Sequence, residues 1–404
     1  MADQVQSRKV RRPDVQVLTA LYFLYFFSYG VYQPYINLHF RRLGMPGSQI
    51  GVLAALRPLL IIFVPPFVGY VADQRHAHRR ALGWLLMGSV VPFYLLLGTH
   101  DFRLLLLTMF AFSAFTSAIT PMLDTNALDV LAGDRTRYGL LRRWGSLGYM
   151  IAVVVCGQLG ERSSIPTLLA ASGVVLLLAG CVAWHWGRQT VDFPSLSVSG
   201  LDSDTSRRWW SEMASTWGEV LRLPGMAALF AAGFLGWVAS STYQIFFTIH
   251  ADALGMSEGL IGVAWGIAVV SEIVFLSLSR RFLTHWGART LFAVGLSAAA
   301  LRWSLYAVVE NVYLVLGLQM LHGLTFGALQ VGAVTYLHAQ APPERRSGAQ
   351  TLWVALTTGV AGAIGAFAGG PLSDALGIQP LFALSGILAL AGALVGWFGV
   401  RTRT

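Results

Sequence analysis

Two ionisable side chains, Asp124 and Arg142, lie within long apolar stretches of the sequence, where a charge is costly and is usually paired or functional. Each is nine residues from position 133, in a short polar turn. In a helical hairpin that rises 1.5 Å per residue, both would lie roughly 10 Å from that turn and could form an ion pair. Such a pair can hold a polar solute, and the carboxylate can exchange a proton when the arginine moves away.

A second group of charges, Glu272, Arg302 and His322, occupies apolar stretches further along the chain. The midpoint of the first two is Gly287, in a polar turn, and the midpoint of the last two falls in the next polar turn. The three side chains therefore share one layer, on the order of 15 Å deep. They form either a structural ion pair or a coupling site. In the second case Glu272 or Asp124 exchanges a proton, Arg302 releases or captures it, and His322 relays it.

The composition places these charges in a membrane protein. Of the 404 residues, 55% are apolar and 12% are charged, against roughly 45–50% and about 25% in soluble domains. So few polar side chains cannot cover a water-facing surface, which excludes a soluble enzyme. The two cysteines, Cys156 and Cys181, lie in apolar runs, so we expect no disulfide framework, no metal site and no cofactor.

The apolar stretches are long enough to cross a bilayer as helices of about 17–25 residues each. The longest polar stretch, 187–224, would be a cytoplasmic linker with an amphipathic helix between two six-helix bundles, 1–186 and 225–404. The predicted fold is an all-α integral membrane protein with twelve transmembrane helices. They are expected near 17–38, 48–72, 81–99, 103–131, 138–159, 164–186, 225–249, 257–279, 288–308, 311–337, 347–371 and 378–400.

The basic residues follow the pattern that sets membrane topology. Most of the 28 lysines and arginines fall in alternate connections, beginning with the N-terminal segment. Both termini are therefore expected in the cytoplasm, on a multi-pass protein of the inner (cytoplasmic) membrane. The same distribution accounts for the net charge of +9 without a nucleic-acid partner.

An internal repeat relates the two halves. Residues 32–45 align without gaps on residues 243–256, and Tyr32 and Tyr243 are one of the identical pairs. Because both segments belong to odd-numbered spans, the halves share one orientation, which is the parallel repeat of major facilitator transporters. In that arrangement the substrate lies between the halves, near the middle of the membrane.

Tyrosines of the first span offer hydroxyl donors to a substrate. Tyr25, Tyr29 and Tyr32 recur at i, i+4 and i+7, so they share one face of a helix. That face either lines a cavity or packs against other helices, and we include all three among the candidate substrate contacts.

The connection between the second and third predicted spans carries an acidic residue followed by a cationic cluster, which is typical of an inter-helix latch. The residues expected to form it are Gly69, Asp73, Arg79 and Arg80. The loop resembles the major facilitator signature, although Gln74 and His78 replace its usual residues.

Further motifs carry a closer likeness. They are Tyr25-Phe26-Phe27-x-x-Gly30-x-Tyr32-x-Pro34, Tyr138-Gly139-Leu140-Leu141-Arg142-Arg143-Trp144-Gly145-Ser146, Leu301-Arg302-Trp303 and Leu321-His322-Gly323-Leu324-Thr325. Over nearly the whole chain they resemble the phenylpropionate permease branch and, more distantly, lactose permease of the oligosaccharide/proton symporters.

This resemblance implies roles for the residues named above. It implies a sugar-contacting or anion-contacting arginine at Arg142 with Asp124 as its acidic partner. It also implies a coupling network at Glu272, Arg302 and His322. Two departures concern lactose permease itself, because Tyr149 stands where that protein has its sugar-stacking tryptophan and Thr325 where it has a proton-carrying carboxylate.

Together these features predict a proton-coupled symporter that imports a small organic solute by alternating access. The solute is an aromatic carboxylate held by Arg142 or Arg302, or a sugar-like polyol held by Asp124, Arg142 and tyrosine hydroxyls. A drug/proton antiporter and a facilitative uniporter remain alternatives. The fifth span has no proline of the kind that exporters carry, and no catalytic cluster indicates an enzyme. The expected partners are the substrate, protons and lipid, and we expect a monomer.

Overall fold

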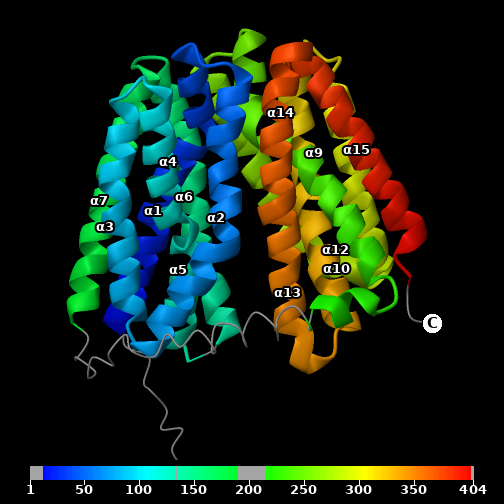
Figure 1. Cartoon of the computed structure of the whole chain (residues 1–404), viewed down its shortest axis with the longest axis horizontal. Helices are drawn as coiled ribbons and strands as arrows, with labels where there is room; N and C mark the ends of the chain where they lie inside the picture. The colour runs from blue at the N-terminus through cyan, green and yellow to red at the C-terminus, as the bar shows by residue number, and fades with distance from the viewer. Residues whose placement is uncertain (1–11, 133, 190–214, 216, 402–404) are drawn as a thin grey trace, which may run out of the picture. The chain divides into compact units, whose positions relative to one another are not determined.

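The computed structural model describes residues 12–132, 134–189, 215 and 217–401, and all regular secondary structure among them is helical. The helices of the first half (Figure 1) are α1 (Arg12–Arg42), α2 (Gly47–Gln74), α3 (His78–Leu97), α4 (Phe102–Ser117), α5 (Ile119–Val130), α6 (Arg135–Gly160) and α7 (Ile165–Arg188).

The second half contains both regular and irregular helices. The regular ones are α9 (Met226–Ala253), α10 (Glu258–Tyr306), α11 (Val312–Leu318), α12 (Leu329–Gln340), α13 (Arg346–Val354), α14 (Gly362–Leu376) and α15 (Ile378–Gly399). Between them lie the 3₁₀ turns η2 (Gln319–Leu321) and η4 (Pro343–Arg345) and the π-helical turns η3 (Gly323–Ala328) and η5 (Ala355–Ala361).

Ten helical segments among the described residues are long and apolar enough to cross a membrane. Two predicted spans, 257–279 and 288–308, both fall in α10, which is interrupted at Gly287 (φ 75°, ψ 164°), a left-handed conformation that favours glycine. The predicted span 138–159 falls in α6, whose first half is rich in arginine. All twelve predicted spans therefore coincide with helices, and the all-α membrane fold is confirmed.

The chain divides into two compact units. The first unit comprises residues 1–36 and 63–196, and the second comprises residues 37–62 and 197–404. The predicted division into 1–186, 187–224 and 225–404 stays a prediction. Most of the predicted linker, and with it the amphipathic helix, lies outside the described residues.

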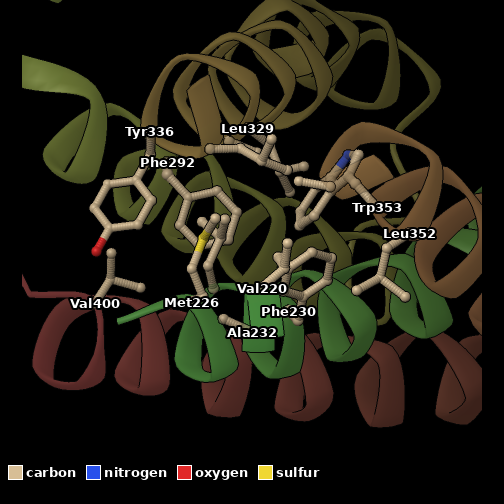
Figure 2. Packing of buried hydrophobic residues seen from close by; sticks show 14 of the residues in the cluster. Val220, Met226, Phe230, Ala232, Phe292, Leu329, Tyr336, Leu352, Trp353 and Val400 are labelled. Carbon is tan, nitrogen blue, oxygen red and sulfur yellow. The ribbon is translucent and has the colours of Figure 1, made fainter. Parts of the chain in front are cut away.

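Close helix packing builds the core of the second unit. A large cluster joins α9, α10, α12, α13 and α15 through buried side chains that include Phe230, Phe292 and Trp353 (Figure 2). A Cβ atom at Gly332 would lie 2.5 Å from the backbone nitrogen of Phe292, so α10 and α12 meet backbone to backbone. Small residues permit such contacts in a membrane, where packing rather than exclusion of water holds helices together.

Polar contacts fix the end of α1 and the start of α2 within the second unit. Arg42 Nη2 lies 2.6 Å from Asp252 Oδ1, and Arg42 Nη1 lies 2.8 Å from Glu258 Oε1. The Asp374 carboxylate accepts hydrogen bonds from the backbone amides of Gly47 (2.6 Å) and Ser48 (2.8 Å). A carboxylate from α14 thus satisfies amides that the first turn of α2 leaves without helical partners.

Candidate substrate and coupling sites

In the first unit, Asp124 on α5 joins residues from three helices. It accepts a 2.6 Å hydrogen bond from the Tyr22 hydroxyl on α1 and a 3.2 Å hydrogen bond from Arg142 Nη1 on α6. Arg142 Nη1 also donates to the Tyr138 hydroxyl, one turn earlier on α6, over 2.8 Å. The structure therefore contains the ion pair that the equal depths of Asp124 and Arg142 predict.

Arg142 is only partly occupied by these contacts. Its side chain is 51% exposed and that of Asp124 is 25% exposed. Within the described residues all hydrogen bonds of the Arg142 guanidinium come from Nη1. The edge formed by Nε and Nη2 can therefore receive a planar anion, which a guanidinium binds through two parallel hydrogen bonds.

The candidate tyrosines of α1 lie in different surroundings. The Tyr25 and Tyr29 rings stack with centroids 6.3 Å apart, and Tyr29 lies 6.2 Å from the ring of Tyr149. Tyr149 donates a 2.6 Å hydrogen bond to Gln33. Tyr32 is buried, and its hydroxyl lies 3.6 Å from Met109 Sδ. Tyr29 and Tyr149 thus form the half-buried part of this aromatic group, whereas Tyr32 packs inside the helix bundle.

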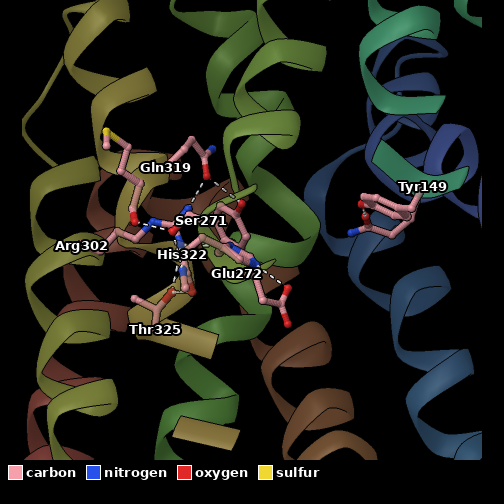
Figure 3. A network of polar contacts seen from close by, with 11 residues as sticks. Tyr149, Ser271, Glu272, Arg302, Gln319, His322 and Thr325 are labelled. Atoms are coloured by element: carbon pink, nitrogen blue, oxygen red, sulfur yellow. Dashed lines mark hydrogen bonds and ion pairs between the residues drawn. The ribbon is translucent and has the colours of Figure 1, made fainter. Parts of the chain in front are cut away.

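In the second unit, Arg302 on α10 is fully buried. Its Nε donates to the Tyr306 hydroxyl over 3.2 Å, and Nη1 donates to Thr325 Oγ1 over 3.1 Å. Nη2 donates to Gln319 Oε1 (Figure 3), which also accepts a 3.0 Å hydrogen bond from Tyr243. The guanidinium carbon lies 4.4 Å from the centre of the Tyr243 ring. Neutral side chains therefore surround this buried charge.

His322 connects Arg302 to Glu272. Arg302 Nη1 lies 3.2 Å from His322 Nδ1, and His322 Nε2 lies 3.8 Å from Glu272 Oε2. Because a guanidinium can only donate, Nδ1 must accept, so His322 is neutral in this arrangement and carries its proton on Nε2, facing the carboxylate. The three charges predicted to share a layer do meet, but histidine separates the acid from the arginine (Figure 3).

Irregular helix geometry directs these side chains. Gln319 and His322 are three residues apart across η2, and in a 3₁₀ turn side chains at i and i+3 lie above one another. Ser271 on α10 supports this turn, because its hydroxyl donates to the Met320 carbonyl over 2.5 Å and accepts from the Gly323 amide over 2.9 Å. From this turn both Gln319 and His322 contact Arg302.

The candidate latch residues make contacts within the first unit. Asp73 Oδ1 lies 2.7 Å from His78 Nε2. Both terminal nitrogens of Arg79 contact the Asp14 carboxylate, at 3.0 and 3.2 Å, and Trp186 donates to the same carboxylate over 2.8 Å. Arg79 therefore ties the start of α3 to α1. Arg80 lies beside it on α3, and within the described structure no neighbour requires position 69 to be glycine.

A family model described as "MFS_1 like family" matches residues 15–384 of the chain. The chain belongs to the MFS_1-like family. This match spans both units and confirms the resemblance to major facilitator transporters that the motifs indicate.

Named relatives of this MFS_1-like protein are transporters and permeases. It is 26% identical to "Maltose permease" of Geobacillus stearothermophilus, with 94% of this chain and 93% of the relative covered. It is 25% identical to "Uncharacterized transporter YwbF" of Bacillus subtilis, with 96% and 94% covered. It is also 25% identical to "Probable 3-phenylpropionic acid transporter" of Escherichia coli, with 79% and 81% covered. These relatives confirm a membrane transporter rather than an enzyme.

Solved structures show the same fold. A point mutant of the nucleoside transporter NupG superposes with a TM-score of 0.83 at 15% identity, covering 96% of this chain and 100% of that one. A bacterial homologue of the lysosomal transporter Spinster superposes with a TM-score of 0.70 at 14% identity, covering 98% and 96%. At these identities the matches show a shared fold.

Sequence reasoning missed the neutral members of both sites. Tyr22 and Tyr138 complete the Asp124 site, and Gln319 and Ser271 complete the Arg302 site. The spacing in the sequence could have predicted two of these residues, because Tyr138 is one helical turn from Arg142 and Gln319 is three residues before His322. Tyr22 and Ser271 could not be predicted in this way, since their partners come from distant parts of the sequence.

Proposed function

We propose that this MFS_1-like transporter is a proton-coupled symporter that imports a small organic solute by alternating access. In this proposal Arg142 and Asp124 bind the solute, and Glu272 carries the proton. One observation supports it above the others: the buried Arg302 has no acid within ion-pair distance among the described residues, and a neutral histidine links it to Glu272.

The linkage offers a way to sense a proton. When Glu272 is ionised, its charge attracts the His322 Nε2 proton and, through the ring, the Arg302 guanidinium. Protonation of Glu272 removes that attraction and leaves Arg302 with neutral partners alone. The Glu272 side chain is 40% exposed, so water can deliver the proton, whereas Arg302 is sealed. The proton state of one carboxyl group would thus change the forces on a buried network.

An aromatic carboxylate is the substrate class that the first site fits best. The unoccupied edge of Arg142 suits a carboxylate, and the Tyr29 and Tyr149 rings lie on the same unit. A sugar-like polyol is the second candidate, because Asp124 and tyrosine hydroxyls can exchange hydrogen bonds with hydroxyl groups. Named relatives include one protein of each class.

Several further features belong to this proposal. We infer that the protein lies in the inner membrane as a monomer, with both termini in the cytoplasm, and that it needs no cofactor. We also infer that the chain consists of the bundles 1–186 and 225–404, joined by the linker 187–224. The charge pattern, the repeat and the lack of a cysteine framework support these inferences.

The test uses the purified protein in liposomes that enclose a pH indicator. Aryl carboxylates and then sugars are added outside, and protein-free liposomes correct for entry of undissociated acid. We expect one class to acidify the lumen, and we expect Glu272→Gln to abolish that acidification. Glu310→Gln is the matched control, because it makes the same chemical change at an exposed carboxylate.

The outcomes separate the alternatives. Acidification that Glu272→Gln removes and Glu310→Gln retains supports symport. A rise in internal pH on substrate entry would instead mean antiport. Exchange of radiolabelled substrate without any pH change would mean uniport, with Glu272, His322 and Arg302 in a structural role.

A further inference from the structure

We propose that a groove between the adjoining ends of α3 and α7 binds the phosphate headgroup of an anionic membrane lipid. The groove has a volume of about 340 Å³ and lies wholly in the first unit. Its lining residues are Arg80, Trp84, Trp184, Gly187 and Arg188. None of these residues belongs to the candidate substrate or coupling sites.

Glycines bring the two helices together at this point. A Cβ atom at Gly83 would lie 3.1 Å from the Trp184 Cα, and one at Gly187 would lie 3.1 Å from the Arg79 carbonyl oxygen. The helices run side by side in Figure 1. This close approach places Arg80, near the start of α3, and Arg188, the last residue of α7, on the same groove.

The charge of the groove suits a phosphate. Arg80 and Arg188 are the two guanidiniums that line the groove, whereas Arg79 pairs with Asp14. No acid among the described residues forms an ion pair with Arg188. Two arginines that line one groove can bind a phosphate group through charge-assisted hydrogen bonds.

The surface beside the groove favours a lipid over a soluble phosphate as the ligand. Trp84 is 63% exposed, and its ring meets that of Trp184 edge-on at 4.6 Å. On α3 the exposed apolar side chains Val91 and Leu95 continue the face of Trp84, at i+7 and i+11. On α7 the exposed Leu177 continues the face of Trp184 in the same way, seven residues earlier. Acyl chains can lie along this strip while tryptophans mark the membrane interface.

Polarity and topology agree with this assignment. The positive-inside pattern predicts the cytoplasm at this end of the helices, and the cytoplasmic leaflet is the one that attracts clusters of arginine through its anionic lipids. Basic pockets between helices on that side are sites where anionic headgroups bind.

The test is native mass spectrometry of the full chain in detergent, titrated with phosphatidylglycerol or phosphatidylcholine. We expect phosphatidylglycerol to bind at lower concentration. We expect Arg188→Gln to weaken phosphatidylglycerol binding about fivefold, because each arginine near an anionic surface contributes about 1 kcal/mol. The double variant Arg80→Gln with Arg188→Gln should weaken the binding about thirtyfold. Arg280→Gln with Arg281→Gln is the matched control, because it removes two exposed arginines that lie outside the groove.

Three results would overturn the proposal. They are equal binding of the two lipids, equal losses in the two double variants, and displacement of phosphatidylglycerol by millimolar inorganic phosphate, which would indicate a soluble anion site. Arg80→Lys with Arg188→Lys should retain most of the binding, which separates loss of the site from loss of the fold. Thermal unfolding of each variant in the same detergent provides the second check on folding.

Discussion

Tyr32 and Tyr243 occupy equivalent positions in the two halves, yet their surroundings differ. Tyr32 packs against Phe93 and Phe112, and its hydroxyl reaches a methionine sulfur at 3.6 Å. Tyr243 lies under the Arg302 guanidinium and donates to Gln319 over 3.0 Å. The described contacts of Tyr32 thus include aromatic rings and a thioether, whereas those of Tyr243 include a buried charge and an amide.

The difference concerns what each tyrosine packs against. Phe93 and Phe112 pack against Tyr32, whereas the guanidinium buried beside Tyr243 carries a desolvation penalty that an apolar side chain avoids. A costly group that packing does not need is a candidate for function. The comparison thus supports a coupling role for Arg302 and predicts how the two halves respond to substitution.

The largest effect is expected from Arg302→Met, which gives the second half a side chain of the kind used in the first. We expect proton-driven accumulation of substrate to fall about 100-fold, near the upper end of coupling energies between sites. The free energy of unfolding should change by only about 1–2 kcal/mol, because removal of a buried charge offsets the lost hydrogen bonds. Uptake under an imposed pH gradient and unfolding in detergent measure the two effects.

Met109→Leu is the control for this substitution in the first half. It should leave accumulation unchanged, because Met109 contributes a weak acceptor and packing volume. If Arg302→Met keeps full accumulation, or if both variants lose it equally, the two surroundings do not differ in function.

A smaller effect is expected at the exposed site of the first unit. Arg142→Lys keeps the charge but replaces the planar fork with a point charge. For a carboxylate substrate we expect the KM for uptake to rise about tenfold, the cost of losing one charge-assisted hydrogen bond. Competition between an aryl carboxylate and a sugar identifies the class affected. An unchanged KM for both would remove Arg142 from the substrate site.

The smallest effects are expected from replacing each of the two tyrosines by phenylalanine. Tyr243→Phe removes a hydrogen bond to an amide oxygen and should cost about 1 kcal/mol of unfolding free energy. Tyr32→Phe removes a contact to a thioether, a weak acceptor, and should cost at most about half as much. Equal costs, measured by chemical unfolding in the same detergent, would contradict the contrast between the halves.

The sequence allowed the charged members of both sites to be placed, because depth in a membrane follows from residue number once a turn is located. Asp124 with Arg142, and the layer of Glu272, Arg302 and His322, were found in this way. The order of contacts within that layer could not be predicted, since it depends on which way each helix is rotated about its axis.

The neutral partners of these charges could not be predicted for a related reason. Gln319 reaches Arg302 from a 3₁₀ turn, and Ser271 satisfies backbone groups of the same irregular segment. Departures from α geometry leave little trace in composition, because they are stabilised by tertiary contacts rather than by local propensity. Tyr22 likewise reaches Asp124 from α1, more than one hundred residues away in sequence.

The π-helical turn Ala355–Ala361 has a consequence for insertions and deletions. A π turn bonds i to i+5 and so contains one more residue than an α turn, while each residue of an α-helix advances by about 100°. Deleting one residue there would let the turn revert to α geometry, so α14 would keep its rotation. The Ala366 carbonyl oxygen would stay beside Gly51 on α2, where a Cβ atom would lie 2.4 Å from it. The same deletion within the regular part of α14 would rotate every later residue by about 100° and change which face of the helix meets its neighbour, without replacing any side chain.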